Sequence, residues 1–144
     1  MHKNNQEKIR YAIAELVEKG DLEIVNEIFA TDYIAHAREK EYSGHSFIKR
    51  FANQLRTAIP DIHLVDVKFL AQEGNTIVWQ RTFRGTHEVK MRGIPPSGKK
   101  VKWVDMVVTR FKNEKIAEEW VVSELMGELL LKVPKSKKAK SGKK

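Results

Sequence analysis

The sequence predicts an α+β fold in which three amino-terminal helices pack on a strongly curved antiparallel sheet. Up to residue 58, apolar residues recur every three or four positions, the spacing of helices with one buried face. From His63 onward they alternate with polar residues, as they do in strands. Short turn segments at 73–75 and 112–114 separate the alternating runs. Helices followed by hairpins predict that the helices close one mouth of a curled sheet.

Each predicted helix has an apolar stripe and a boundary signal. The stripes are Ile9, Ala12, Ile13, Leu16 and Val17 in the first helix, Leu22, Val25, Ile28 and Phe29 in the second, and Phe47, Ile48, Phe51, Leu55 and Ala58 in the third. Gly20 ends the first helix, and Asp21 caps the second. Ser43 caps the third helix and Pro60 ends it. Residues 33–36 are expected to be extended or irregular.

Four strands are predicted after the helices. They cover residues 63–72, 76–88, 99–112 and 115–124, with a loop at 93–98 that contains two prolines and two glycines. The faces expected to point inward are Trp79, Arg81, Phe83 and His87, then Val101, Trp103, Asp105, Val107, Thr109 and Phe111, then Ile116, Glu118, Trp120, Val122 and Glu124. Each set combines large apolar groups with ionisable ones, which neither a plain core nor a solvent face does. The sequence therefore predicts an apolar cavity with a few convergent polar groups.

Composition indicates one soluble globular domain. The chain has 144 residues, of which 41% are hydrophobic and 32% are charged. No apolar run approaches the roughly 20 residues of a membrane span, and the amino terminus lacks the apolar core of a signal peptide. The absence of cysteine excludes disulfides and thiolate ligands. The scattered histidines form no ligand set, so no metal is expected. A cytoplasmic location is expected from the absence of cysteine and of a signal peptide.

The positive charge is concentrated in the carboxyl-terminal tail. Seven of the eight net charges lie in residues 132–144, which leaves a net charge of +1 for residues 1–131. Because it has almost nothing to bury, the tail is predicted to be disordered, with residues 1–131 forming the domain. The tail either solubilises the protein or attracts nucleic acid or an anionic surface without specificity. It has no aromatic residues for stacking on bases, so no specific nucleic-acid recognition is expected.

Several short motifs follow one another in a definite order. They are Gly20-Asp21-Leu22, Tyr33-Ile34-Ala35-His36, Gly44-His45, Ile59-Pro60-Asp61-Ile62, Arg81 to Gly85-Thr86-His87, Pro96-Ser97-Gly98-Lys99 and Lys115-Ile116-Ala117-Glu118-Glu119-Trp120. This ordered set resembles the SnoaL-like polyketide (ester) cyclases of the nuclear-transport-factor-like, or cystatin-like, α+β cone superfamily. The resemblance covers about residues 8–131.

The resemblance implies a small-molecule enzyme that needs no cofactor. Members of the family close a ring by intramolecular aldol condensation of a polyketide ester. A pocket carboxylate, usually an aspartate four residues after a tryptophan like Trp120, acts as general acid and base. Here that position is Glu124, which keeps the carboxylate and reaches one methylene further. Val89, where a glycine is common, and the sequence after Val121 also depart from the family pattern.

The candidate site residues follow from the inward faces and the resemblance. The catalytic candidates are Glu124, Asp105 and His87, and the substrate-binding candidates are Arg81, Trp79, Trp103, Trp120, Tyr33 and His36. Glu124 or Asp105 would remove a proton alpha to a carbonyl, while His87 and Arg81 stabilise the enolate. Each catalytic candidate has a structural alternative: Glu124 pointing to solvent or to a lysine, Asp105 paired with Arg81 to hold the sheet, and His87 as a satisfied structural histidine. Tyr33 and the three tryptophans have packing as their alternative.

Three functions are compatible with these features. The first is an acid–base enzyme that acts on a small apolar or aromatic carbonyl compound, with a homodimer as the expected assembly. The second is a non-catalytic module of the same fold that binds a ligand or dimerises through its sheet. The third is an accessory protein whose lysine tail contacts nucleic acid.

Overall fold

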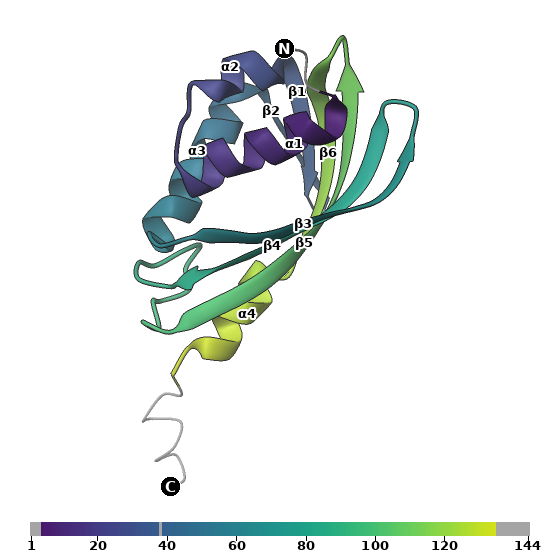
Figure 1. The fold of residues 1–144 in the computed structure, drawn as a ribbon. Helices are drawn as coiled ribbons and strands as arrows, with labels where there is room; N and C mark the ends of the chain where they lie inside the picture. The colour runs from purple at the N-terminus through teal and green to yellow at the C-terminus, as the bar shows by residue number, and fades with distance from the viewer. Residues whose placement is uncertain (1–3, 38, 135–144) are drawn as a thin grey trace, which may run out of the picture.

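The computed structural model describes residues 4–37 and 39–134 and has the predicted α+β class, with helices on one face of a bent sheet (Figure 1). The helices are α1 (Asn5–Ile13), which continues into the π-helical segment η1 (Ala14–Glu18), then α2 (Ile24–Ile28), α3 (Gly44–Ala58) and α4 (Leu125–Lys132). The strands are β1 (Phe29–Ala37), β2 (Lys40–Ser43), β3 (His63–Glu73), β4 (Thr76–Thr86), β5 (Lys100–Lys112) and β6 (Lys115–Ser123).

The sheet is mixed rather than wholly antiparallel. Its strand order is β2-β1-β6-β5-β4-β3, and β1 runs parallel to β6 while all other neighbours are antiparallel. Residues 33–36, expected as extended or irregular, lie inside β1. Their partner strand begins about 80 residues later in the chain, and local periodicity carries no information about such a distant pairing.

Three amino-terminal helices form as predicted, with small differences at their ends. The first begins earlier than its apolar stripe, at a capping box in which Asn4 and Glu7 each bond the other's backbone N–H. Ser43 occupies the N-cap position of α3 without a side-chain hydrogen bond. Asp21 accepts from the Glu23 N–H in the turn that leads to α2. The fourth helix, α4, was not predicted, because its buried stripe is only Leu125 and Leu129.

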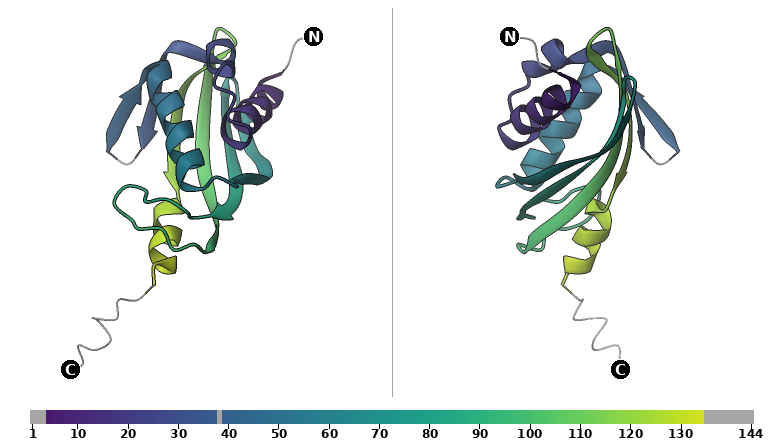
Figure 2. Two further views of the ribbon diagram at one scale, coloured as in Figure 1. Left: turned by 90° about the vertical axis from the view of Figure 1, so that its left-hand side faces the viewer. Right: turned by 45° about the vertical axis from the view of Figure 1, so that its right-hand side comes forward.

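Turns and bulges give the sheet its curvature. Gly74 takes a φ of 59° in the two-residue β3–β4 turn, and Asn113 and Glu114 have φ of 51° and 68° in the β5–β6 turn. Positive φ values of this kind match the right-handed twist of paired strands. Extra residues interrupt the pairing at Val65 and Leu70 in β3, and bulges of this type bend a strand. The helices α1 and α3 lie across the concave side of the resulting sheet (Figure 2).

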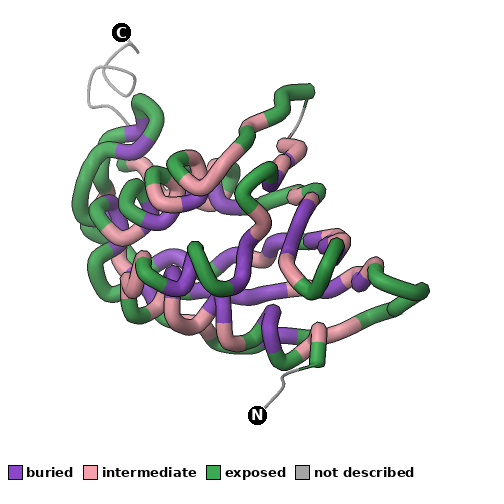
Figure 3. Tube along the Cα trace, turned by 90° about the horizontal axis from the view of Figure 1, so that it is seen from above, coloured by how far each residue is buried: buried purple, intermediate pink, exposed green. Residues whose placement is uncertain are grey.

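The core lies between these helices and the concave face. Buried segments run along the inner sides of the helices and central strands, whereas hairpin tips are exposed (Figure 3). The fully buried apolar residues include Val17, Val25, Ala52, Ile59, Ile77, Phe83 and Leu129. The predicted disordered tail falls largely in residues 135–144, which lie outside the described part of the chain. Within the described part, no helix is both long and apolar enough to cross a membrane.

Two motifs that are far apart in the sequence meet at the end of α3. Asp61 accepts hydrogen bonds from the Thr86 backbone N–H (2.6 Å) and hydroxyl (2.8 Å), and the Thr86 bonds lower the pKa of the Asp61 carboxyl. A Cβ atom on Gly85 would stand 2.2 Å from Ile59 Cγ2. Glycine at position 85 therefore lets β4 approach the helix end closely, and this role for the motif is structural.

We expect Gly85→Ala to destabilise the protein. The added methyl group would overlap Ile59, and overpacking of this kind costs about 1–3 kcal/mol in free energy of unfolding. Urea denaturation measures the change. Gly127→Ala is the matched control, because a Cβ there meets nothing within 4 Å and alanine favours helix α4. Equal stability of the two variants would contradict the close approach at Gly85.

Candidate functional site

A cavity of about 920 Å³ lies between the helices and the concave face of the sheet. Its helical wall is apolar and is formed by Ile9, Ala12, Ile13, Leu16, Phe47, Ile48 and Phe51. Strands β1, β4 and β6 supply the opposite wall, and the start of α4 adds Leu125 and Met126. The volume falls at the upper end of the roughly 300–1,000 Å³ usual for small-molecule sites. The cavity is thus large enough for a ligand of several fused rings.

Three buried polar side chains from three strands interrupt the apolar lining. They are Tyr33 of β1, Arg81 of β4 and Glu119 of β6. Their exposed fractions are 4%, 5% and 8%, so water outside the cavity hardly reaches them. The lining also includes the charged residues Glu39 and Arg92, from the segments that follow β1 and β4, and Lys40 at the start of β2.

Glu119 is held by hydrogen bonds to both of its carboxylate oxygens. The Tyr33 hydroxyl donates to Oε1 over 2.8 Å, and the Thr109 hydroxyl donates to Oε2. Thr109 lies on β5 and is fully buried. Its oxygen in turn accepts from the Trp79 indole Nε1–H at 2.8 Å. A chain of hydrogen bonds therefore runs from Trp79 through Thr109 to Glu119 and ends at Tyr33.

Burial dominates the electrostatics of Glu119. Loss of water around the carboxylate raises its pKa above the ordinary value of 4.5. Hydrogen bonds from Thr109 and Tyr33 and the positive charge of Arg81 oppose that rise. Burial and the nearby Glu119 charge also raise the pKa of Tyr33 well above 10.0, so its hydroxyl stays protonated. A carboxyl with a raised pKa beside a neutral phenol is suited to accept and return a proton.

Arg81 pairs with Asp105 through its Nε–H, while its terminal amino groups remain available to the cavity. Its Nε–H donates to Asp105 Oδ2 at 2.7 Å, and the two residues face each other across β4 and β5. The guanidinium also lies over the rings of Trp79 and Phe83, at 5.6 and 5.7 Å from their centroids. Among the described residues, its terminal amino groups have no hydrogen-bond partner, and Arg81 lines the cavity. Those amino groups can therefore donate to an oxygen of a ligand.

A sequence model of the SnoaL-like polyketide cyclase family matches residues 7–130. The chain belongs to this family. No curated protein matches the sequence.

Solved structures of three similar proteins share the fold. A candidate SnoaL-like polyketide cyclase from Jannaschia sp. CCS1 has a TM-score of 0.80 and 17% identity, with 94% of this chain and 99% of that chain covered. A candidate polyketide cyclase from Acidithiobacillus ferrooxidans has a TM-score of 0.75 and 21% identity, with coverages of 92% and 97%. The candidate hydroxylase AclR from Streptomyces galilaeus has a TM-score of 0.74 and 22% identity, with coverages of 88% and 92%. These likenesses establish the fold and leave the reaction open.

Four of the predicted substrate-binding residues border the cavity of this SnoaL-like protein. They are Tyr33, His36, Trp79 and Arg81. The imidazole of His36, however, lies on the outer face of the sheet, where it stacks on its cross-strand partner Trp120 and its Nε2 lies 2.6 Å from Glu118 Oε2. Hydrogen bonds from His36 and Arg110 lower the pKa of Glu118. The predicted side chains that the structure gathers around one space are therefore those of Tyr33, Trp79 and Arg81.

Three further predicted residues are buried without lining the cavity. Trp103 packs on Phe83, with 5.5 Å between the ring centroids, and Asp105 lies behind Arg81. His87 is fully buried just after β4, and neither ring nitrogen has a hydrogen-bond partner among the described residues. The predicted Arg81–Asp105 pair is confirmed. His87 lies apart from the polar groups of the cavity, so its expected contact with an enolate has no geometric support.

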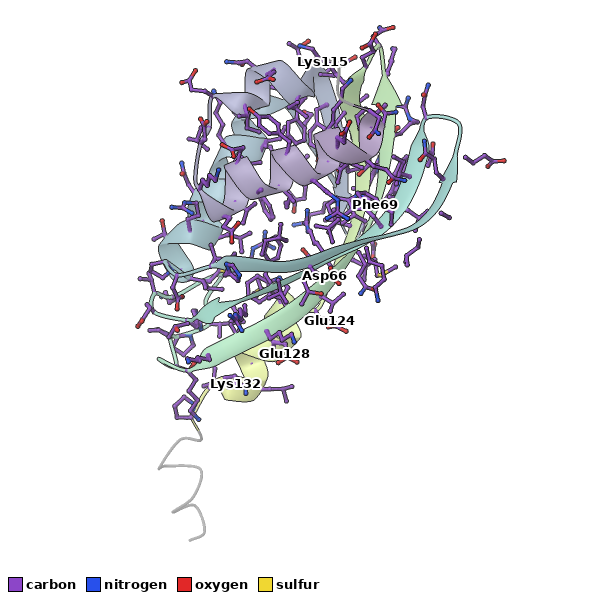
Figure 4. The ribbon with its side chains drawn as sticks, viewed as in Figure 1. Asp66, Phe69, Lys115, Glu124, Glu128 and Lys132 are labelled. Carbon is purple, nitrogen blue, oxygen red and sulfur yellow. The ribbon has the colours of Figure 1, made fainter. Side chains whose placement is uncertain are left out.

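The expected inward orientation of Trp120 and Glu124 is wrong. Trp120 is 38% exposed and stacks on His36 outside the cavity lining, with 5.0 Å between the ring centroids. Glu124 is exposed and occupies the N-cap position of α4, where its side chain accepts from the Val104 N–H at 3.3 Å. Figure 4 shows Glu124 beside β5 near the start of α4, away from α1.

A bulge at Ala117 causes this reversal. Phe111 pairs with Ile116 but Arg110 pairs with Glu118, so Ala117 is an extra residue in β6. One extra residue moves every following side chain to the opposite face. Glu119, Val121 and Ser123 consequently line the cavity, whereas Glu118, Trp120 and Glu124 of the expected set do not. Val122 borders the cavity but is 74% exposed.

Sequence reasoning missed Glu119 as a functional candidate. Thr109 was placed correctly on the inner face of its strand but was given no role. The bulge leaves one signal in the sequence: two consecutive apolar residues, Ile116 and Ala117, which are both buried in the structure. Two adjacent apolar residues before two glutamates are compatible with either register, so the pattern alone does not reveal which glutamate faces inward.

Glu119→Gln should remove part of the pH dependence of stability. Because the pKa of Glu119 is raised in the folded state, its contribution to stability is fully present below about 4.5 and is lost as pH rises through the folded pKa. Glutamine has no such titration and can keep both hydrogen bonds. The difference in free energy of unfolding between variant and wild type should therefore grow in favour of glutamine as pH rises. Denaturant titrations at a series of pH values from below 4.5 upward measure this difference. A difference that stays constant with pH would contradict a raised pKa for Glu119.

Proposed function

We propose that the protein binds a small, mostly apolar carbonyl compound in the cavity and acts on it as a cofactor-independent acid–base catalyst. Glu119 carries this proposal, because it is a buried carboxylate in the wall of a large apolar cavity with donors on both oxygens. Membership of the SnoaL-like family supports the same class of reaction. The position that the resemblance assigns to the acid–base group, Glu124, faces away, and we assign that role to Glu119 instead.

The proposed reaction begins with proton abstraction. Glu119 accepts a proton from the carbon alpha to the carbonyl, and the electron pair of the broken C–H bond moves onto the carbonyl oxygen as an enolate. The terminal N–H groups of Arg81 donate to that oxygen. In a substrate with a second carbonyl, the enolate carbon attacks it and forms the ring C–C bond. The resulting alkoxide takes the proton back from Glu119, so the carboxylate is regenerated.

Exchange of alpha protons in D₂O tests the first step. The probe is 2-tetralone, a bicyclic apolar ketone that matches the apolar lining, and NMR follows replacement of its alpha protons by deuterium. We expect wild-type protein to accelerate the exchange. Glu124→Gln is the matched control, because this carboxylate is exposed and should not contribute. Exchange that depends on Glu124 rather than Glu119 would overturn the assignment.

Binding without catalysis is the second candidate function. It is favoured by one observation, that the carboxylate at the family's expected acid–base position lies outside the cavity. In that case 2-tetralone would bind, as seen by a change in thermal midpoint or in NMR shifts, and wild-type protein would leave its exchange rate unchanged.

We also propose that the protein is a homodimer that associates through the outer face of its sheet. Three exposed apolar residues lie on this face, and Met106 pairs directly with Val122 across β5 and β6, with Trp120 two residues away. Met106→Glu should shift the protein from dimer to monomer in light scattering, since a charge at the centre of an apolar contact is poorly solvated. A wild-type protein that is already monomeric would refute the proposal.

A further inference from the structure

On the Oε2 side of Glu119, the hydrogen bonds run in one direction, from Trp79 through Thr109 to the carboxylate. The indole Nε1–H of Trp79 is only a donor, so Thr109 Oγ1 must accept it and can turn its own hydrogen to Glu119 Oε2. The Thr109 hydroxyl has no other acceptor among the described residues, so a proton on Oε2 would leave the buried Thr109 hydrogen unpaired. The proton that Glu119 takes up is therefore best accommodated on the other oxygen, Oε1.

Tyr33 is the residue that senses a proton on Oε1. Its hydroxyl oxygen lies 2.8 Å from Oε1. When Glu119 is ionised, the Tyr33 hydroxyl donates to it. When Oε1 carries a proton, two hydrogens cannot occupy the same contact, so Oε1–H donates to the Tyr33 oxygen and the Tyr33 hydrogen turns away. Glu119 is the sole hydrogen-bond partner of the Tyr33 hydroxyl in the described part of the chain, and Tyr33 lines the cavity.

We propose that Tyr33 is a second catalytic residue whose hydroxyl changes partner during the reaction, from Glu119 before proton transfer to the ligand's oxyanion after it. This inference rests on the proposed function. In the step, the ligand C–H bond breaks and the proton forms a bond to Glu119 Oε1. The electron pair moves to the ligand oxygen, and the Tyr33 O–H keeps its covalent bond and rotates from Oε1 to that oxygen. The donor is thus released when the negative charge reaches the ligand.

The charges of the site are consistent with this exchange of partners. Before the step the negative charge is on Glu119, beside Tyr33 and Arg81. After it the negative charge is on the ligand oxygen, and the open amino groups of Arg81 and the released Tyr33 hydroxyl can both donate to it. Tyr33 stays protonated throughout because burial keeps its pKa high.

A glutamine at position 119 reproduces the protonated state of the site without any reaction. Its side-chain oxygen accepts from Thr109, and its NH₂ group donates to the Tyr33 oxygen, which leaves the Tyr33 hydrogen free for the cavity. The probe is 4-nitrophenolate, an aromatic oxyanion, measured above its own pKa so that it is ionised. We expect Glu119→Gln to bind it about tenfold or more tightly than wild type, the scale of one hydrogen bond to a charged group.

A second substitution separates the hydroxyl of Tyr33 from the lost charge of Glu119. The double variant Tyr33→Phe/Glu119→Gln should lose most of the gain in affinity, because phenylalanine cannot donate. Tyr42→Phe/Glu119→Gln is the matched control, since Tyr42 also lines the cavity but does not contact Glu119, and it should keep the gain. The absorbance of the probe gives its dissociation constant in each variant.

The outcomes are distinct from those of the exchange assay. A gain that survives Tyr33→Phe would come from charge alone and would overturn the role of Tyr33, as would the absence of any gain in Glu119→Gln. Failure of wild-type protein to exchange protons of 2-tetralone would instead count against the proposed function. A gain that requires Tyr33 but not Tyr42 supports the change of partner.

Discussion

We expect the Glu119→Gln variant to exchange the alpha protons of 2-tetralone about 10²- to 10⁴-fold more slowly than wild type, the range that one positioned general base supplies. Glutamine preserves the side-chain volume and can accept from Thr109 while donating to Tyr33, so the cavity should keep its shape. The loss should therefore appear in kcat, with little change in KM.

The pH profile distinguishes this loss from general damage. In wild type, exchange should rise as pH increases through the raised pKa of Glu119, because only the ionised carboxylate accepts a proton. The remaining activity of Glu119→Gln should lack that rise, whereas Glu124→Gln should retain it in full. A Glu119→Gln protein with wild-type rate and profile would remove Glu119 from the mechanism.

We expect Asp105→Ala to lower the free energy of unfolding by about 3–5 kcal/mol, the cost of leaving a buried charge without its partner. Asp105 and Arg81 are 3% and 5% exposed and share a 2.7 Å hydrogen bond, so solvent cannot replace the lost carboxylate. Chemical denaturation measures the effect, which should exceed that of any surface carboxylate such as Glu124.

A double variant tests whether the loss of stability comes from losing the Arg81–Asp105 ion pair or from leaving Arg81 buried without a partner. Replacing both residues with apolar groups, as in Arg81→Met/Asp105→Leu, should restore most of the lost stability, because no unpaired charge then remains buried. The double variant should still fail to bind an oxyanion, since Arg81 would be absent. An Asp105→Ala protein as stable as wild type would show that water reaches Arg81, which would contradict the isolation that its burial indicates.

The inner faces of β4 and β5 were predictable because their alternation is uninterrupted. Trp79, Arg81, Trp103 and Asp105 all lie on the buried face where the period of two places them. The turns at Gly74 and Asn113 were predictable for a similar reason, since turn chemistry is local. The four strand ends that flank these turns therefore need no information from distant parts of the chain.

The remaining features depend on contacts that local patterns do not encode. The parallel pairing of β1 with β6 joins segments about 80 residues apart, and it converts an expected antiparallel sheet into a mixed one. The bulge at Ala117 shifts the register of the β5–β6 hairpin by one residue, and the alternation of apolar residues does not reveal that shift. Because Glu119 reaches the cavity only through that bulge, the central group of the site could not be assigned from alternation.

The bulge also makes the chemistry of the cavity depend on the register of β6. If β6 paired without the bulge, Ala117 would lie opposite Arg110, so Glu118 and Trp120 would face inward and Glu119 would turn to solvent. The cavity wall would then carry Glu118 and Trp120 in place of Glu119 without any substitution. Relatives whose sixth strand lacks this bulge are therefore expected to diverge in reaction, even where their aligned residues are identical.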